Sequence, residues 1–267
     1  MLDQILNINQ PRIAVTELFG AIGSPSRTTE YIRMLRAIEE NNRIRGLVID
    51  IDSPGGAAGP SEYLYRSVAK IAKKKPVVAF IRGTGASGAY MVAAGATKII
   101  AVPMALIGSI GVISMRPMLY EALGKIGVRM ETTKAGRLKD MFSNFREPTE
   151  EERQREQALL NSFYEQFIAL VAEARGMPAE RVRELATGEV FTSAEAQANG
   201  LIDGLGDLDT AIDLAQELAR LPERRLTYVR PHRGLRERLL SNTAMALVDS
   251  VAWAIEGRLR SHGPYAG

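Results

Sequence analysis

Residues 77–102 read VVAFIRGTGASGAYMVAAGATKIIAV, and their pattern indicates the fold class. The run Val77–Ile81 is apolar and rich in β-branched residues, as expected of a strand buried on both faces. A glycine-rich turn over 83–88 follows, then a short apolar helix to about 95 and a second buried strand over 98–102. A strand, a helix and a strand in this order predict a parallel βαβ unit.

The same alternation extends in both directions from this unit. On the N-terminal side it predicts strands over 12–19 and 46–51 and helices over 27–41 and 60–74. From residue 148 onward the chain is mainly helical, and Thr149 with Glu152 forms a capping box that opens a long helix. Its expected buried face holds Leu160, Phe163, Phe167 and Val171. We therefore predict an α/β domain over 1–219, with a mostly parallel sheet covered by helices.

Residues 220–267 differ from this domain in composition. Seven arginines and two glutamates lie between positions 220 and 238, and helical periodicity follows over 239–259, with Leu240, Leu247, Val248, Val251 and Ile255 on one face. We interpret 220–267 as a basic, amphipathic tail forming a helical C-terminal extension. Such a tail can contact a membrane surface peripherally or pack against a neighbouring subunit.

Composition excludes several kinds of chemistry. The chain has no cysteine, which removes thiol nucleophiles, disulfides and thiolate metal sites. Its two histidines, His232 and His262, both lie in the tail, and no metal site is indicated around them. The net charge of +3 is too small and too scattered to argue for nucleic acid. The sequence shows neither a signal peptide nor a membrane-spanning run, so we expect a cytoplasmic or peripheral membrane-associated protein.

One motif within residues 77–102 has two interpretations. Gly83-x-Gly85-x-x-Gly88 follows a strand and opens a helix, as a dinucleotide-binding fingerprint does. That fingerprint also needs an acidic residue at the end of the next strand, and here the nearest acid downstream is Glu121. The dinucleotide interpretation is therefore disfavoured.

Ser87 fits the same turn as a nucleophile, because a sharp strand-to-helix junction with small neighbours leaves its hydroxyl accessible. Its plain alternative is an N-cap serine. The turn Asp52–Gly56 ends an earlier buried strand and should lie at the same edge of the sheet. Its paired glycines either let backbone N–H groups approach a substrate carbonyl or form an ordinary turn.

A serine nucleophile needs a base. Because both histidines lie in the tail, a lysine that is partly buried, and so neutral often enough to accept a proton, is the favoured type of base. The candidate is Lys139 in Lys134-Ala-Gly-Arg-Leu-Lys139-Asp140, although a solvated surface role is the usual fate of a lysine.

Several motifs match one family in order. They are the DSPGG turn, the box from Gly83 to Tyr90, Ile107–Ile113, K-x-G-x-x-K-D at 134–140, the REPTEEER stretch that follows, and the segment 188–206. Over about 12–218 the chain resembles the signal peptide peptidase family of serine proteases (protease IV, SppA-type). The core of that family resembles ClpP and the crotonases.

The resemblance implies a ClpP/crotonase-like fold and a Ser-Lys dyad, with Ser87 as nucleophile, Lys139 as general base and Ser109 orienting the lysine amine. It implies an oxyanion hole from Gly55, Gly56 and Gly88. It implies hydrophobic peptide substrates such as remnant signal peptides, a homo-oligomer shaped as a ring or dome, and no cofactor. Family members carry an N-terminal anchor that this sequence does not show. Two rival functions are a crotonase-type acyl-CoA enzyme and a catalytically silent oligomeric scaffold.

Overall fold

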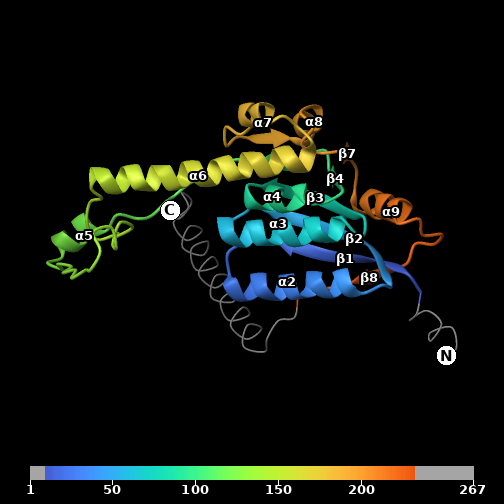
Figure 1. The fold of residues 1–267 in the computed structure, drawn as a ribbon, viewed down its shortest axis with the longest axis horizontal. Helices are drawn as coiled ribbons and strands as arrows, with labels where there is room; N and C mark the ends of the chain where they lie inside the picture. Colours follow the sequence, from blue (N-terminus) through green and yellow to red (C-terminus); the bar gives the residue numbers. More distant parts are fainter. Residues whose placement is uncertain (1–9, 232–267) are drawn as a thin grey trace, which may run out of the picture.

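A mostly parallel sheet forms the centre of the molecule in the computed structural model, which describes residues 10–231 (Figure 1). The strands follow one another across the sheet in the order β6-β5-β3-β2-β1-β8, and β4 and β7 branch from β3. Among the described residues only the β5–β6 pair is antiparallel. The strands are β1 (Arg12–Phe19), β2 (Ile44–Ser53), β3 (Val77–Ala86), β4 (Lys98–Ala101), β5 (Leu106–Gly108), β6 (Val190–Thr192), β7 (Gly204–Leu205) and β8 (Leu226–Tyr228).

Strand β3 pairs with two different strands, β4 and β5, along one of its edges. Its first half, Val78–Ile81, pairs with β4, and its last residues, Thr84–Ala86, pair with β5. On its other side β3 pairs with β2 in parallel. The segment 83–88, expected to be a glycine-rich turn, is therefore β-strand as far as Ala86, because Gly83 and Gly85 belong to β3. Within residues 77–94, therefore, no glycine-rich phosphate loop remains for a dinucleotide, and the bend between β3 and the following helix falls on Ser87.

Helices cover both faces of the sheet, which confirms the predicted α/β class. One layer holds α2, α3, α4 and α6, and α9 packs on the opposite face against β1, β2 and β3. Residues of β1 alternate accordingly: Ala14 and Leu18 face the first layer, and Ile13 and Val15 face α9. The helices are α2 (Pro25–Glu40), α3 (Ala58–Ala72), α4 (Gly88–Ala94), α5 (Tyr120–Lys125), α6 (Glu150–Arg175), α7 (Ala179–Leu185), α8 (Ser193–Ala198) and α9 (Leu208–Leu218).

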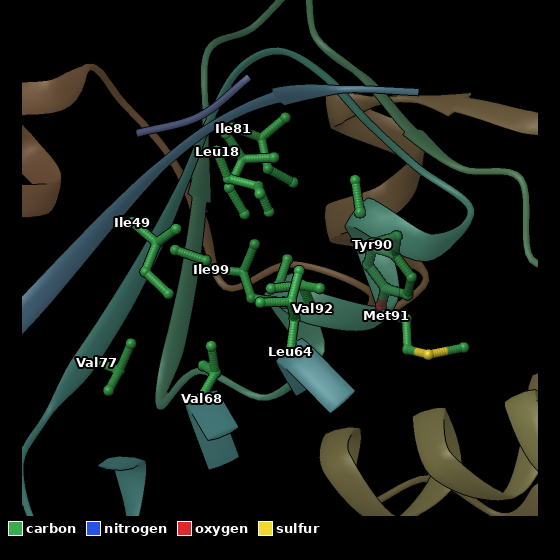
Figure 2. Close-up of a cluster of buried hydrophobic side chains, with 14 of the residues drawn as sticks. Leu18, Ile49, Leu64, Val68, Val77, Ile81, Tyr90, Met91, Val92 and Ile99 are labelled. Carbon is green, nitrogen blue, oxygen red and sulfur yellow. The ribbon is translucent and has the colours of Figure 1, made fainter. Parts of the chain in front are cut away.

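Helix α4 lies wholly inside the core, and all seven of its residues are buried. Figure 2 shows its residues Tyr90, Met91 and Val92 beside strand residues such as Ile99 and beside Leu64 of α3. The Tyr90 hydroxyl donates a hydrogen bond to the backbone oxygen of Leu201 over 2.9 Å. The packing of these residues and this hydrogen bond thus hold α4 in place.

Residues 112–149, which we call the arm, lie at the start of α6, away from α7 and α8 (Figure 1). Its one helix, α5, has no buried residue. Large apolar side chains of the arm are exposed, among them Ile113 at 84%, Met115 at 89% and Ile126 at 72%. The arm therefore contributes little to the core of its own chain.

Two features refine the expected organisation. The capping box at Thr149 and Glu152 opens α6 as predicted, and Gly176 ends the helix in the left-handed conformation. Residues 220–231 of the predicted tail add β8 to the sheet beside β1, and 232–267 lie outside the described residues. The division at 219 stays a prediction. Among residues 10–231, no helix combines the length and the apolar composition needed to cross a bilayer.

Candidate active site

Ser87 forms the bend between β3 and α4, in a backbone conformation that residues other than glycine rarely adopt. Its φ is 51° and its ψ is −124°. Such a conformation costs about 1–3 kcal/mol and persists only where the surroundings impose it. Here the N–H of Ser87 donates to the Gly108 oxygen over 2.7 Å, and its carbonyl accepts from the N–H of Met91 over 3.0 Å. This geometry is that of a nucleophile elbow, in which the bend presents the hydroxyl to the site.

The loop that carries Gly55 and Gly56 lies directly against this bend. A Cβ added at Gly55 would lie 2.6 Å from the backbone nitrogen of Gly88 and 2.7 Å from the oxygen of Ala86. At Gly56 an added Cβ would meet the Ile22 oxygen at 1.8 Å. Both glycines also have positive φ, of 90° and 154°. The close approach of the two loops therefore requires glycine at both positions.

The three N–H groups predicted for the oxyanion hole differ in what they bind. The N–H of Gly55 donates to the hydroxyl of Ser53 over 3.1 Å inside the protein. Those of Gly56 and Gly88 donate to no residue in the described part of the chain. Two N–H donors beside a serine hydroxyl are what stabilisation of a tetrahedral oxyanion requires. Ser53 holds the loop, a role that the sequence did not reveal.

Ser109 repeats the backbone geometry of Ser87. Its φ is 48°, and its N–H donates to the Glu189 oxygen over 2.7 Å. Because Ser87 is hydrogen-bonded to Gly108, the two serines sit on adjacent bends of β3 and β5 and line the same cavity. The hydroxyls of both serines make no hydrogen bond within residues 10–231. The structure thus brings Ser87, Ser109 and the three glycines together.

The cavity that holds these groups has a volume of about 1100 Å³. One wall is the glycine loop with the start of α4, and the opposite wall comes from α6 and the loop before β6. Its apolar lining includes Met91, Val112, Leu160, Phe163 and Phe167. The expectation that Phe163 is buried in the core is wrong: 45% of it is exposed, because it faces this cavity. The cavity can take an extended chain with apolar side chains.

Lys139 does not join this group in its own chain. It lies in the arm, it is exposed rather than partly buried as expected, and it is not part of the cavity lining. The reason is the attachment of the arm: Arg146 binds Glu152, and Arg116 binds Glu156 over 2.6 Å, both in the first turns of α6. These ion pairs hold the arm on α6, whereas Ser87 sits at the start of α4.

No carboxylate competes for the role of base near Ser87 within residues 10–231. Asp52 accepts the N–H of Thr84 over 2.9 Å, and Glu62 binds Arg66 over 2.6 Å. Neither of these two carboxylates lines the cavity. In the same part of the chain, no group of three histidine, aspartate or glutamate side chains could hold a metal ion.

The fold and this geometry define a class: an α/β protein with a serine elbow of the hydrolase type. The model of peptidase family S49 matches residues 69–222, and the chain belongs to this family. The match contains the elbow, Ser109, the arm and most of the C-terminal half of the described chain.

Curated relatives agree with the family. Protease 4 of Salmonella typhi is 35% identical over 210 residues, which is 78% of this chain and 33% of that protein. The chloroplastic serine protease SPPA of Arabidopsis thaliana is 33% identical over 213 residues, 78% of this chain and 32% of that protein. A putative protease of Methanocaldococcus jannaschii is 37% identical over 191 residues, 72% of this chain and 61% of that protein. The chain therefore spans about a third to three fifths of the length of these relatives.

A solved structure shares the fold. A mutant of the membrane-bound stomatin-specific protease 1510-N superposes with a TM-score of 0.54, covering 84% of this chain and 99% of that chain. Its sequence identity of 17% carries the comparison no further than the fold. The SppA-type peptidase family predicted from the motifs is confirmed by the family match and the curated relatives.

Proposed function

We propose that this chain is a serine endopeptidase in which Ser87 is the nucleophile. The observation that carries the proposal is the elbow: a strained serine with an unbonded hydroxyl beside the unbonded N–H groups of Gly56 and Gly88, all within residues 10–231. In the proposed reaction the Ser87 oxygen attacks the peptide carbonyl and forms a C–O bond, and its proton passes to a base. The two N–H groups bind the oxyanion. The base returns the proton to the amine as the peptide C–N bond breaks, and water then releases the acyl group.

Lys139 is the proposed base, and it reaches Ser87 from a neighbouring subunit. The support is the arm, which carries Lys139 away from its own cavity while exposing apolar side chains such as Ile113 and Met115. Such side chains are usually covered by protein. A second copy that seats the arm over the cavity would cover them and bring the amine to Ser87 and Ser109. The same contact would lower the exposure of Lys139, which a neutral lysine requires.

The proposed substrates are extended, hydrophobic peptides such as remnant signal peptides or fragments of membrane proteins. The support is the apolar lining of the cavity beside the elbow, which is formed by Met91, Val112, Leu160, Phe163 and Phe167. Apolar side chains of a bound peptide would be removed from water there, at about 25 cal/mol per Å² of apolar surface.

The nucleophile is tested with a fluorophosphonate probe, which reacts with activated serines. We expect wild-type protein to be labelled at Ser87 and to cleave a fluorogenic hydrophobic peptide. Ser87→Ala should lose both properties with an unchanged circular dichroism spectrum. Ser67→Ala, which alters a half-buried serine of α3 outside the cavity, is the matched control. Full peptidase activity in folded Ser87→Ala would disprove the proposal.

Supply of the base from a second subunit is tested by complementation. Ser87→Ala and Lys139→Ala homo-oligomers should each be inactive. Mixed oligomers should regain activity, because a Ser87 from one chain then meets a Lys139 from the other. Inactive mixed oligomers, shown to contain both chains, would place the dyad within one chain.

A further inference from the structure

A second cavity, of about 560 Å³, lies between α2 and the edge strand β8. It shares no residue with the cavity at Ser87, because β8 and β5 lie near opposite edges of the sheet. Figure 1 shows β8 beside α2, on the side of the sheet away from α6 and α7. We call this cavity the α2–β8 groove.

The floor of the α2–β8 groove is apolar. Met34 and Ile38 of α2 and Ile44 of β2 line it, and each is less than one tenth exposed. Val229, just after β8, adds a fourth apolar wall. The groove thus has a floor that favours hydrocarbon over water.

The rim of the groove is basic. The lining includes Arg12, Arg33, Arg43 and Arg230. Among the described residues that line the groove, Glu30 is the only one with a carboxylate. Arg33 binds Glu30 over 2.6 Å, and Arg230 binds Glu17, outside the groove, over 3.0 Å. The guanidinium group of Arg43 makes no hydrogen bond or ion pair within residues 10–231. Arg33 and Arg230 each face one carboxylate, whereas Arg43 faces none among the described residues, so its positive charge is left over.

We propose that the α2–β8 groove binds the headgroup of an anionic phospholipid, so that this face of the protein docks on an anionic membrane. Guanidinium groups match the oxygens of a phosphate with paired hydrogen bonds. An apolar floor beneath them suits the first part of an acyl chain, which free phosphate lacks. The proposal does not depend on the proposed peptidase reaction.

The continuing chain is a poorer match for the groove than a lipid. Directly after Pro231 the sequence carries Arg233, Arg236 and Arg238 against Glu237, so its charge has the same sign as the rim. Like charges do not complement each other, so this stretch does not suit the rim, but the rim and the stretch can both be attracted to one anionic surface. Arginines near such a surface each strengthen attachment, by about fivefold.

Vesicle binding of the full chain tests the proposal. We expect co-sedimentation with vesicles that contain phosphatidylglycerol, and not with vesicles of phosphatidylcholine alone. Arg43→Gln should weaken binding about fivefold, and Arg33→Gln with Arg43→Gln by more than about tenfold. Arg36→Gln is the matched control, because this exposed arginine lies on α2 but does not line the groove. An equal loss in Arg36→Gln, or no loss in the double variant, would overturn the proposal.

Calorimetry separates a lipid from free phosphate. A soluble short-chain phosphatidylglycerol should bind more tightly than inorganic phosphate, and Arg43→Gln should weaken its binding. Phosphate that binds as tightly as the lipid would mean that the apolar floor has no role, which contradicts the proposal. Peptide hydrolysis without vesicles should be unchanged in all three variants, because none alters the Ser87 cavity. A failure of the groove is thus distinguishable from a failure of the proposed peptidase.

Discussion

Arg146 of the arm donates hydrogen bonds to both oxygens of Glu152, with its Nη1 2.8 Å from Oε2. The same guanidinium binds Asp140, the residue after Lys139, through Nε at 2.8 Å. Glu152 is 2% exposed and also accepts the N–H of Thr149, which closes the capping box of α6. One arginine therefore joins the Lys139 loop to the first turn of the long helix.

Arg146→Ala is expected to lower both stability and peptidase activity. It leaves the carboxylate of Glu152 without its cationic partner and releases the loop that carries Lys139. Urea denaturation should show a lower midpoint, and kcat should fall with little change in KM. Arg153→Ala, an exposed arginine one turn into α6, is the control and should leave both unchanged. If Arg146→Ala behaves like Arg153→Ala, the link to Lys139 is wrong.

Stability should fall in acid, and Glu152 should account for part of the fall. Its hydrogen bonds with Arg146, and then with the N–H of Thr149, lower the pKa of Glu152 from 4.5 to about 2. Because the pKa is lower in the folded state, the carboxylate stabilises the fold above about pH 4.5, and this contribution is lost as the pH falls toward 2. Urea midpoints measured across this range should decline less steeply in Glu152→Gln than in wild type. Parallel declines would contradict the assignment.

Tyr90→Phe is expected to destabilise the protein by about 1–2 kcal/mol, since it removes one hydrogen bond and leaves a buried carbonyl unpaired. The ring stays, so packing around α4 is preserved. The affected contact is the 2.9 Å bond to the Leu201 oxygen. Thermal or urea unfolding measures the loss, and Tyr63→Phe, at a position 54% exposed, should show almost none.

Ser53→Ala should reduce kcat about tenfold and leave KM nearly unchanged, because the loop would then present the Gly56 N–H less well to the oxyanion. Ser53 is a positioning residue here: its hydroxyl accepts the N–H of Gly55 over 3.1 Å. Steady-state kinetics with the fluorogenic peptide checks the expectation. A rise in KM at constant kcat would mean that Ser53 supports peptide binding instead.

Ser109→Ala should weaken activity by about tenfold to a hundredfold without abolishing it, since this hydroxyl is proposed to orient the lysine amine rather than to react. The motivation is that Ser109 lines the Ser87 cavity and its hydroxyl makes no hydrogen bond within the described residues. Wild-type kinetics in Ser109→Ala would remove it from the mechanism, and complete inactivity would give it a larger role.

Local pattern predicts most of the fold. The apolar runs of β2 and β3 and the capping box at Thr149 each carry their signal within a few residues, so the predicted strands and the start of α6 agree with the structure. The turn at Asp52–Gly56 and Ser87 are expected at one edge of the sheet, and parallel strand ends bring them together there.

What the pattern could not predict depends on contacts between distant residues. Strand β8 forms because β1 offers it an open edge, although three residues within an arginine-rich stretch carry almost no strand signal. Phe163 has the spacing of a core residue but faces a cavity, and spacing does not distinguish the two. The position of Lys139 depends on Arg146 and Glu152, which no periodicity predicts.

The burial of all seven residues of α4 affects how fast this part of the chain opens. We expect the hydrogen-bonded amides of such a helix to exchange with deuterium mainly through large openings of the domain, and the amides of an exposed segment such as α5 to exchange through small local openings. Ser87 directly precedes this buried helix, and Lys139 is an exposed residue of the arm, so we expect the surroundings of Ser87 to open more slowly than those of Lys139 in an isolated chain. The surroundings of Ser87 and Lys139, the two members of the proposed dyad, would then open at similar rates only after subunits have assembled.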